Sequence, residues 1–216
     1  MLLALDTATT YASIALYNGD AVLAELNWRS ERRHTVELAP QVDNLLRLAG
    51  VTPADLTALG VGIGPGSYTG TRIALSFAKG MALALNLPIV GVPTLDALAL
   101  PHLPAPAPLC ALLAAGRGRY VWSLYQSQTS QPQRLVDFGL AKMPEILPQL
   151  PAPVQLVGEI SAEDKLLIAE TLGADADILS PARALRRASA LAERAWARFV
   201  AGDVDDPVTL SPIYLS

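Results

Sequence analysis

The distribution of apolar and polar positions in the first thirty residues predicts strands. Three apolar stretches follow one another, and the turn signal Asn18-Gly19-Asp20 separates the second from the third. The expected strands are Leu2–Asp6, Thr10–Tyr17 and Ala21–Trp28. The pattern therefore predicts a three-stranded meander at the start of the chain.

The period then changes to that of a helix. Apolar residues recur at i, i+4, i+7 and i+11 from His34 to Ala49, and Gly50 supplies a stop signal. A second run with helical spacing covers Gly70–Leu85. The short apolar runs Ala58–Ile63 and Ile89–Val92 predict buried strands beside these helices.

Four prolines lie within residues 101–108, which can neither continue a helix nor join a central strand. We expect the domain boundary there, with one lobe over 1–104 and another over 105–216. Beyond it the order of elements repeats: strands at Leu109–Ala115, Arg119–Gln126, Arg134–Leu140 and Val154–Val157, helices at Pro144–Leu150 and Ala162–Leu172. A last helix is predicted over 181–201, and packing of this helix back on the first lobe is left open.

Two βββαβα lobes indicate an α/β fold of the type shared by actin, Hsp70 and the sugar kinases, in which a nucleotide lies between the lobes. In this chain the first phosphate turn would contain Asp6 and Thr7, which could hold a metal-bound phosphate. The alternative is a turn in which these side chains bond nearby backbone.

The stretch GPGSYTG, residues 64–70, leaves two interpretations open. Gly66 permits close backbone approach, and Ser67 can cap the following helix, whose amides could bind an anion. The stretch is neither a Walker A sequence nor G-x-G-x-x-G, so it could also be only a tight corner.

Composition narrows the classes of function. The 216 residues are 51% hydrophobic and 17% charged, with a net charge of −4, so no basic tract indicates independent binding of nucleic acid. The single cysteine, Cys110, fits a reducing compartment and is interpreted as buried filler. No uninterrupted apolar segment reaches the roughly 18 residues of a membrane helix, so we expect a cytoplasmic protein without membrane contact.

Three stretches together carry a family resemblance: LALDTAT at residues 3–9, HTVELAP at 34–40, and the long segment from Gly62 to Ala99 that contains GPGSYTGTRI. With LLAAGRGRYVWSLY at 112–125 and the closing PIYL, they resemble the bacterial TsaB (YeaZ) family. The resemblance implies a non-catalytic subunit of the machinery that makes threonylcarbamoyladenosine beside the tRNA anticodon. The paralogue TsaD transfers the threonylcarbamoyl group there, and the ATPase TsaE joins the complex.

The resemblance also implies how the partner is bound. In the family, two helices pack against their counterparts in TsaD as a four-helix bundle, and TsaB alone forms a homodimer that mimics this pair. Contact with tRNA would come mainly through the complex. The interface residues implied are His34, Leu38, Val42, Leu45, Ile73, Phe77 and Met81. The alternative is that both helices face only their own sheet.

The resemblance argues against a catalytic role. The transferase holds its metal with a His-x-x-x-His pair, and the matching positions here are Thr94 and Leu98, which cannot form that site. Relatives often carry Asp and Glu around the second phosphate turn, where this chain has Ala114 and Arg119. We therefore expect no catalytic residue, no metal site and no metal peptidase activity.

No cofactor is expected to be required. Weak ATP or ADP binding at Asp6, Thr7, Gly66 and Ser67 stays open, as a vestige of the fold. The alternative function is a small actin-like phosphotransferase that uses ATP on a metabolite.

Overall fold

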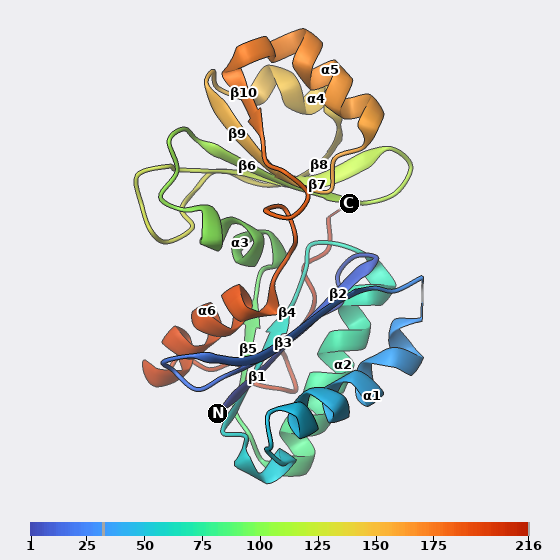
Figure 1. Ribbon diagram of the computed structural model, residues 1–216, viewed down its shortest axis with the longest axis vertical. Helices are drawn as coiled ribbons and strands as arrows, with labels where there is room; N and C mark the ends of the chain where they lie inside the picture. Colours follow the sequence, from blue (N-terminus) through green and yellow to red (C-terminus); the bar gives the residue numbers. More distant parts are fainter. Residues whose placement is uncertain (32, 216) are drawn as a thin grey trace. The chain divides into compact units, whose positions relative to one another are not determined.

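The computed structural model describes residues 1–31 and 33–215, which divide into two units. Unit 1 contains Met1–Ala97 and Arg187–Tyr214, and unit 2 contains Leu98–Arg186 together with Leu215. Each unit is built on one five-stranded sheet (Figure 1). Within the described residues, no helix has both the length and the apolar character that a membrane crossing needs.

Unit 1 has a mixed sheet in the order β3-β2-β1-β4-β5. The first three strands are antiparallel neighbours, and β4 and β5 continue the sheet in parallel with β1. The strands are β1 Leu2–Asp6, β2 Tyr11–Tyr17, β3 Val22–Arg29, β4 Ala58–Gly62 and β5 Ile89–Val92. The helices are α1 His34–Leu48, η1 Pro53–Asp55, α2 Tyr68–Leu85 and α6 Ala188–Val200.

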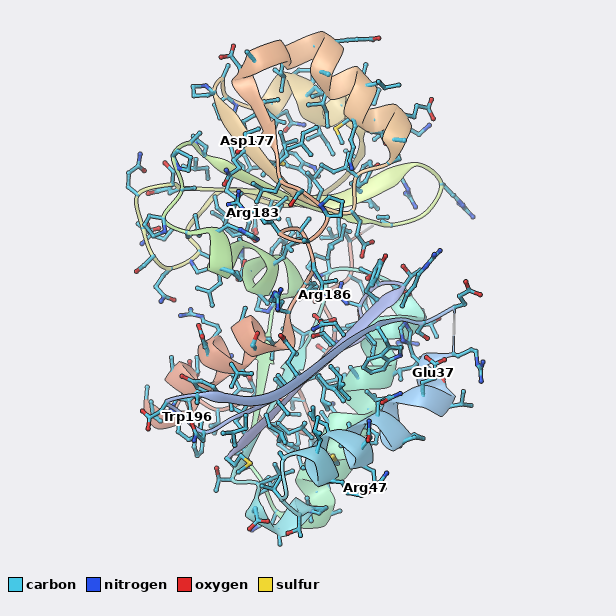
Figure 2. All side chains as sticks on the ribbon, in the orientation of Figure 1. Glu37, Arg47, Asp177, Arg183, Arg186 and Trp196 are labelled. Carbon is cyan, nitrogen blue, oxygen red and sulfur yellow. The ribbon has the colours of Figure 1, made fainter. Side chains whose placement is uncertain are left out.

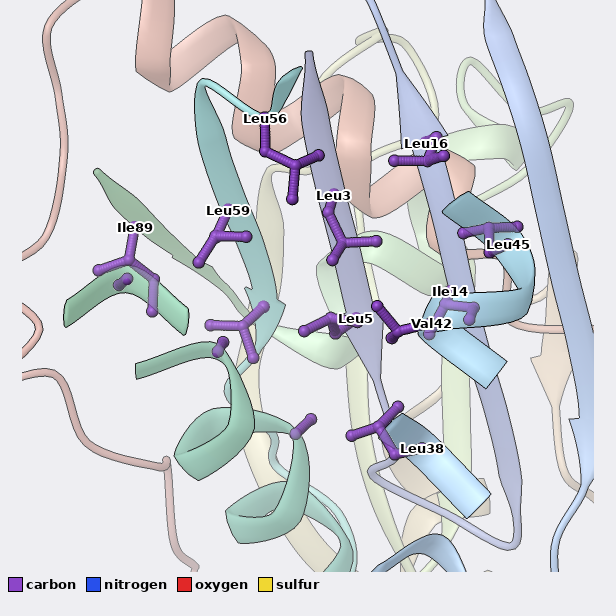
Figure 3. Packing of buried hydrophobic residues seen from close by; sticks show 14 of the residues in the cluster. Leu3, Leu5, Ile14, Leu16, Leu38, Val42, Leu45, Leu56, Leu59 and Ile89 are labelled. Atoms are coloured by element: carbon purple, nitrogen blue, oxygen red, sulfur yellow. The ribbon is translucent and has the colours of Figure 1, made fainter. Parts of the chain in front are cut away.

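Alternate residues of the central strand β1 serve two separate cores, because successive side chains of a strand point to opposite faces. Leu3 and Leu5 pack in the cluster that contains the buried residues of α1 and α2, as Figure 3 shows. Leu2 and Ala4 pack in a second cluster with Leu191 of α6. Helices therefore cover both faces of the sheet, with α1 and α2 on one side and α6 on the other (Figure 1).

Helix α6 also supports the hairpin between β2 and β3. Trp196, labelled in Figure 2, meets the ring of Tyr17 edge to face with centroids 5.9 Å apart. Gly19 has a φ of +103°, and a Cβ built there would lie 2.9 Å from the Trp196 ring. The turn thus needs glycine both for its backbone conformation and for its contact with the helix.

The segment after α6 runs along the edge of the sheet. Asp205 forms a bridge with Ile89 of β5, and its carboxylate accepts a hydrogen bond of 2.8 Å from the amide of Gly91. Farther on, the amide of Ile213 donates to the carbonyl of Ile63 at 2.8 Å. The bonds of Asp205 cover the free edge of β5, and the bond of Ile213 attaches the last residues of unit 1 next to the end of β4.

Unit 2 repeats the arrangement with the order β10-β9-β6-β7-β8. Its strands are β6 Leu109–Ala114, β7 Arg119–Tyr125, β8 Arg134–Lys142, β9 Val154–Gly158 and β10 Ala176–Ile178. Its helices are α4 Met143–Ile146, α5 Ala162–Leu172, η2 Leu100–His102, η3 Leu147–Gln149 and η4 Gly173–Asp175. One apolar cluster joins Leu112, Trp122, Met143 and Ile168 from its strands and helices. A further helix, α3 Thr94–Ala99, begins in unit 1 and ends in unit 2.

The two sheets have the same topology, since the fourth strand of each unit pairs in parallel with the first and the fifth follows it. This is the duplicated α/β arrangement of the actin, Hsp70 and sugar-kinase fold, as the order of elements predicted.

Besides small shifts at the ends of several elements, three features differ from the sequence expectation. The last helix begins at Ala188 and not at 181, because the amides of Arg183 and Ala184 both bond the carbonyl of Ser180 in a turn. Helix α3 and strand β10 were not predicted, being only six and three residues long. The first segment of unit 1 ends at Ala97 and not at 104, and residues 187–214 pack with the first sheet, the arrangement of the last helix that the sequence left open.

The packing of α6 gives the first prediction. Leu191→Ala should lower the free energy of unfolding of unit 1 by about 2–5 kcal/mol, because it leaves a cavity in a core where Leu191 is fully buried. Leu83→Ala, on the exposed surface of α2, should change it by less than about 0.5 kcal/mol. Urea unfolding followed by circular dichroism checks both. Equal effects would show that α6 adds little to this core.

Candidate functional site

The loop after β1 is folded onto its own backbone. Asp6 is 1% exposed, and its Oδ1 accepts a hydrogen bond of 2.7 Å from the amide of Ala8. The carboxylate also lies against β4, since a Cβ at Gly62 would come within 2.5 Å of its Oδ2. Asp6 therefore stabilises the turn that follows it, as the second of the two sequence interpretations describes.

Thr7 joins this loop to the start of α2. Its hydroxyl donates to the carbonyl of Gly70 at 2.6 Å and accepts from the amide of Ala74 at 3.2 Å. The side chain is fully buried. Thr7 thus fixes the first turn of α2 against the end of β1.

The glycines of GPGSYTG make this joint possible. A Cβ at Gly66 would lie 2.5 Å from the carbonyl oxygen of Ala8, and one at Gly70 would overlap the carbonyl oxygen of Thr7. Only a residue without a side chain lets the two backbones approach so closely.

Amides that a phosphate loop would present to a ligand are bonded within the protein. The amide of Ser67 donates to Ala8 O at 2.6 Å, and that of Gly64 donates to Thr94 Oγ1 at 3.1 Å. The amide of Gly70 donates to Ser67 Oγ at 3.2 Å, so Ser67 caps α2. This geometry favours the tight corner over the phosphate cradle, while weak nucleotide binding stays a prediction.

An apolar groove of about 510 Å³ lies between α1 and α2. Its floor comes from Leu38, Ile73 and Phe77, and its rim from exposed residues at the start of both helices. The full lining is Thr35, Leu38, Ala39, Tyr68, Thr69, Arg72, Ile73, Ser76 and Phe77. A concave surface with this composition suits the apolar side chains of another protein.

The residues expected at the interface on α1 are buried in unit 1 itself. Leu38, Val42 and Leu45 are at most 4% exposed and pack in the core of the sheet, as Figure 3 shows. His34 is 6% exposed, and its Nε2–H donates to the carbonyl of Thr9 at 2.8 Å. His34, Val42 and Leu45 therefore offer almost no surface to a partner, whereas Leu38 also lines the groove between α1 and α2, and the docking role of these four residues stays a prediction.

The expected interface residues on α2 are less buried than those on α1. Ile73, Phe77 and Met81 are half-buried at the border of the same core, and the first two also line the groove. Part of each side chain is therefore open to solvent. Their role in docking stays a prediction, and the groove gives it a definite location.

Sequence reasoning missed a cluster at the mouth of the groove. The guanidinium of Arg72 lies over the ring of Tyr68 at 3.9 Å, and Tyr214 stacks on Tyr68 with centroids 4.9 Å apart. The Arg72 Nε donates to the Tyr214 hydroxyl at 2.5 Å, which raises the pKa of Arg72 above its ordinary value. Arg72 and Tyr214 stand within GPGSYTGTRI and PIYL, but spacing alone could not show that these distant motifs meet.

The remaining residues considered for metal binding or nucleophilic chemistry are buried inside the protein. Thr94 is buried and accepts the bond from Gly64, while Leu98 is 2% exposed. Cys110 is fully buried in the core of unit 2, and burial raises the pKa of its thiol far above the ordinary value. In residues 1–31 and 33–215, no group of three or more His, Cys, Asp or Glu side chains could hold a metal ion.

The proteins that match this chain in sequence are named for the same modification of tRNA. The family model "TsaD: tRNA N6-adenosine threonylcarbamoyltransferase" matches residues 28–178. The tRNA threonylcarbamoyladenosine biosynthesis protein TsaB of Bacillus subtilis is 33% identical over 194 residues, which are 88% of this chain and 85% of that protein.

Comparison with solved structures gives matches over nearly the whole chain. YeaZ from Pseudomonas aeruginosa superimposes with a TM-score of 0.82 at 27% identity, covering 99% of both chains. The activator of the 2-hydroxyisocaproyl-CoA dehydratase from Clostridium difficile covers 95% of this chain and 98% of its own, with a TM-score of 0.56 at 10% identity. This second likeness shows the fold alone.

The close approach at Gly70 can be tested within a single helix. Gly70→Ala should lower the free energy of unfolding by about 1–3 kcal/mol, because the new Cβ would force the Thr7 backbone away. Gly80→Ala, also in α2, meets nothing within 4 Å and should raise it by about 0.5–1 kcal/mol. Thermal and urea unfolding measure both. An innocuous Gly70→Ala would show that the two loops are not tightly joined.

Proposed function

The chain belongs to the TsaB family of tRNA threonylcarbamoyladenosine biosynthesis proteins, and we propose that it acts there as a non-catalytic subunit that binds and stabilises a TsaD-type transferase. The observation that carries this proposal is the apolar groove between α1 and α2. A TsaE-type ATPase would join the complex, and tRNA would be reached through it, in the cytoplasm.

The matching family model supports the choice of partner. It describes a transferase, and the residues it matches include all of α1 and α2. A transferase of that family would therefore carry a counterpart of this helix pair, and two such pairs could face each other as a four-helix bundle. The same argument allows a homodimer of this chain when the partner is missing.

The surroundings of the two positions that match the transferase's metal ligands support a non-catalytic role. Thr94 uses its hydroxyl to hold Gly64, and Leu98 offers no donor atom. In the second half, Ala114 ends β6 and Arg119 begins β7, so neither supplies the carboxylate expected at that turn. These residues therefore fit a protein that supports the transferase better than one that carries out the transfer.

The alternative of an ATP-dependent phosphotransferase is not favoured by the relatives, which are named for tRNA modification. The internal bonds of Asp6 and Ser67 also weigh against it.

The non-catalytic proposal and this alternative predict opposite results for ATP hydrolysis, and we expect the result of the former. The isolated chain with Mg²⁺ and ATP should release phosphate no faster than a buffer blank, and Asp6→Ala should not change that rate. Phosphate release is followed by a coupled assay. Hydrolysis that Asp6→Ala removes would overturn the non-catalytic proposal.

The docking role can be tested by mixing the chain with the TsaD-type transferase of the same organism on a sizing column with light scattering. Phe77→Asp should abolish the mixed complex, because it buries a charge in an apolar groove. Ser76→Arg should also abolish it by filling the groove from an exposed position. Leu166→Asp makes a similar change at a residue of α5 that is 68% exposed and should have no effect.

Circular dichroism is the control for folding, since Phe77 also borders the core. Loss of binding with Ser76→Arg in a folded protein supports the groove. Full binding by both groove variants would show that the partner docks elsewhere.

A further inference from the structure

Arg72 is the one charged residue among the nine that line the groove between α1 and α2. It projects from the exposed side of α2, one turn beyond Tyr68. A single cation at the mouth of an apolar groove favours an anionic group of the partner at that one point.

The guanidinium is held in place before any partner arrives. It lies 3.9 Å from the ring centroid of Tyr68 and 5.4 Å from that of Tyr214, and its Nε bonds the Tyr214 hydroxyl. Both rings are themselves exposed, at 56% and 46%. A side chain restricted in this way loses less conformational entropy on binding than a free arginine would.

Tyr214 reaches this place because the segment before it is attached to the sheet. Its neighbour Ile213 donates to Ile63 O, and Asp205 bonds both Ile89 and Gly91 of β5. The tail therefore positions Tyr214, and Tyr214 positions Arg72.

Two other charged side chains of these helices, Glu37 and Lys79, are engaged elsewhere. Glu37 accepts a hydrogen bond of 3.0 Å from the Trp28 indole and pairs with Arg33 at 3.7 Å. Lys79, two turns along α2, donates to Val208 O at 3.4 Å. None of the residues that line the groove carries a carboxylate that could neutralise Arg72.

We propose that Arg72 determines the specificity of this docking surface, and that its occupant is an amphipathic helix of the TsaD-type partner. The helix places apolar side chains over Ile73 and Phe77 and one carboxylate against the Arg72 guanidinium. The inference rests on the docking role proposed above and adds the chemistry of the partner. An apolar groove alone would accept many helices, whereas the arginine selects the partner and register that bring a carboxylate to it.

A protein carboxylate fits this surface better than a nucleic-acid phosphate. The floor of the groove is apolar, and the chain has a net charge of −4. Nucleic-acid sites instead combine several cations along one face.

The experiment is titration calorimetry of this chain with the TsaD-type transferase at low and high salt. Arg72→Gln should weaken binding about 10- to 100-fold and reduce its salt dependence, since removal of one partner of a charge pair in an interface costs affinity. Lys79→Gln, on the same helix, should change binding less than about threefold. Tyr214→Phe keeps the ring and removes the hydrogen bond to Arg72, and should give an intermediate loss.

A charge exchange identifies the contact. Arg72→Glu should bind poorly to the natural transferase and regain affinity with a transferase in which the facing carboxylate is replaced by lysine. Acidic residues on the transferase's matching helices are replaced one at a time to find it. Failure of every exchange would overturn the carboxylate contact.

The outcomes separate this inference from the docking role. If Ser76→Arg abolishes the complex while Arg72→Gln binds as the original chain does, the inference is wrong and the docking role stands. If neither changes binding, the docking role itself fails. If Arg72→Gln affects only a homodimer of this chain, or only its binding of tRNA, the proposed occupant is wrong.

Discussion

The arrangement of unit 1 depends on one joint, where the loop after β1 meets the start of α2. The Thr7 hydroxyl bridges Gly70 O and the Ala74 amide, and Ser67 N bonds Ala8 O. Because these bonds fix both the position and the direction of the first turn, they determine where every later residue of α2 points. The floor of the groove and the place of Arg72 both follow from this joint.

The same joint bears on the docking role proposed above for a fold associated with nucleotide binding. In this chain the glycines bring two backbones together, and the amides of Gly64, Ser67 and Gly70, which could face a phosphate, instead bond groups of the protein. The helix start is thereby made rigid without a ligand. A rigid helix start is what a preorganised docking surface requires, since ordering it during association would cost free energy.

The periodicity of the sequence was enough to predict most elements, because apolar spacing differs clearly between strands and long helices. It could not resolve the six residues of α3 or the three of β10, which are shorter than the patterns that identify them. It also could not distinguish a helix face that packs on its own sheet from one that packs on a partner. Leu38, Val42 and Leu45 have helical spacing in either case, and only the position of the sheet shows that they are core residues. The contact between Arg72 and Tyr214 could not be predicted either, because two residues 142 positions apart leave no periodic signal in the sequence.

The division of the chain has a consequence for its synthesis. Unit 1 is discontinuous, and the 89 residues from Leu98 to Arg186 separate its first sheet from α6. A ribosome that adds about 5–20 residues per second needs roughly 5 to 20 s to cover that interval. Throughout it, the face of β1 formed by Leu2 and Ala4 lacks the helix that buries it in the finished protein. Unit 2 is nearly continuous and is made within this interval, so this apolar face of unit 1 stays open to aggregation and to chaperones until α6 emerges.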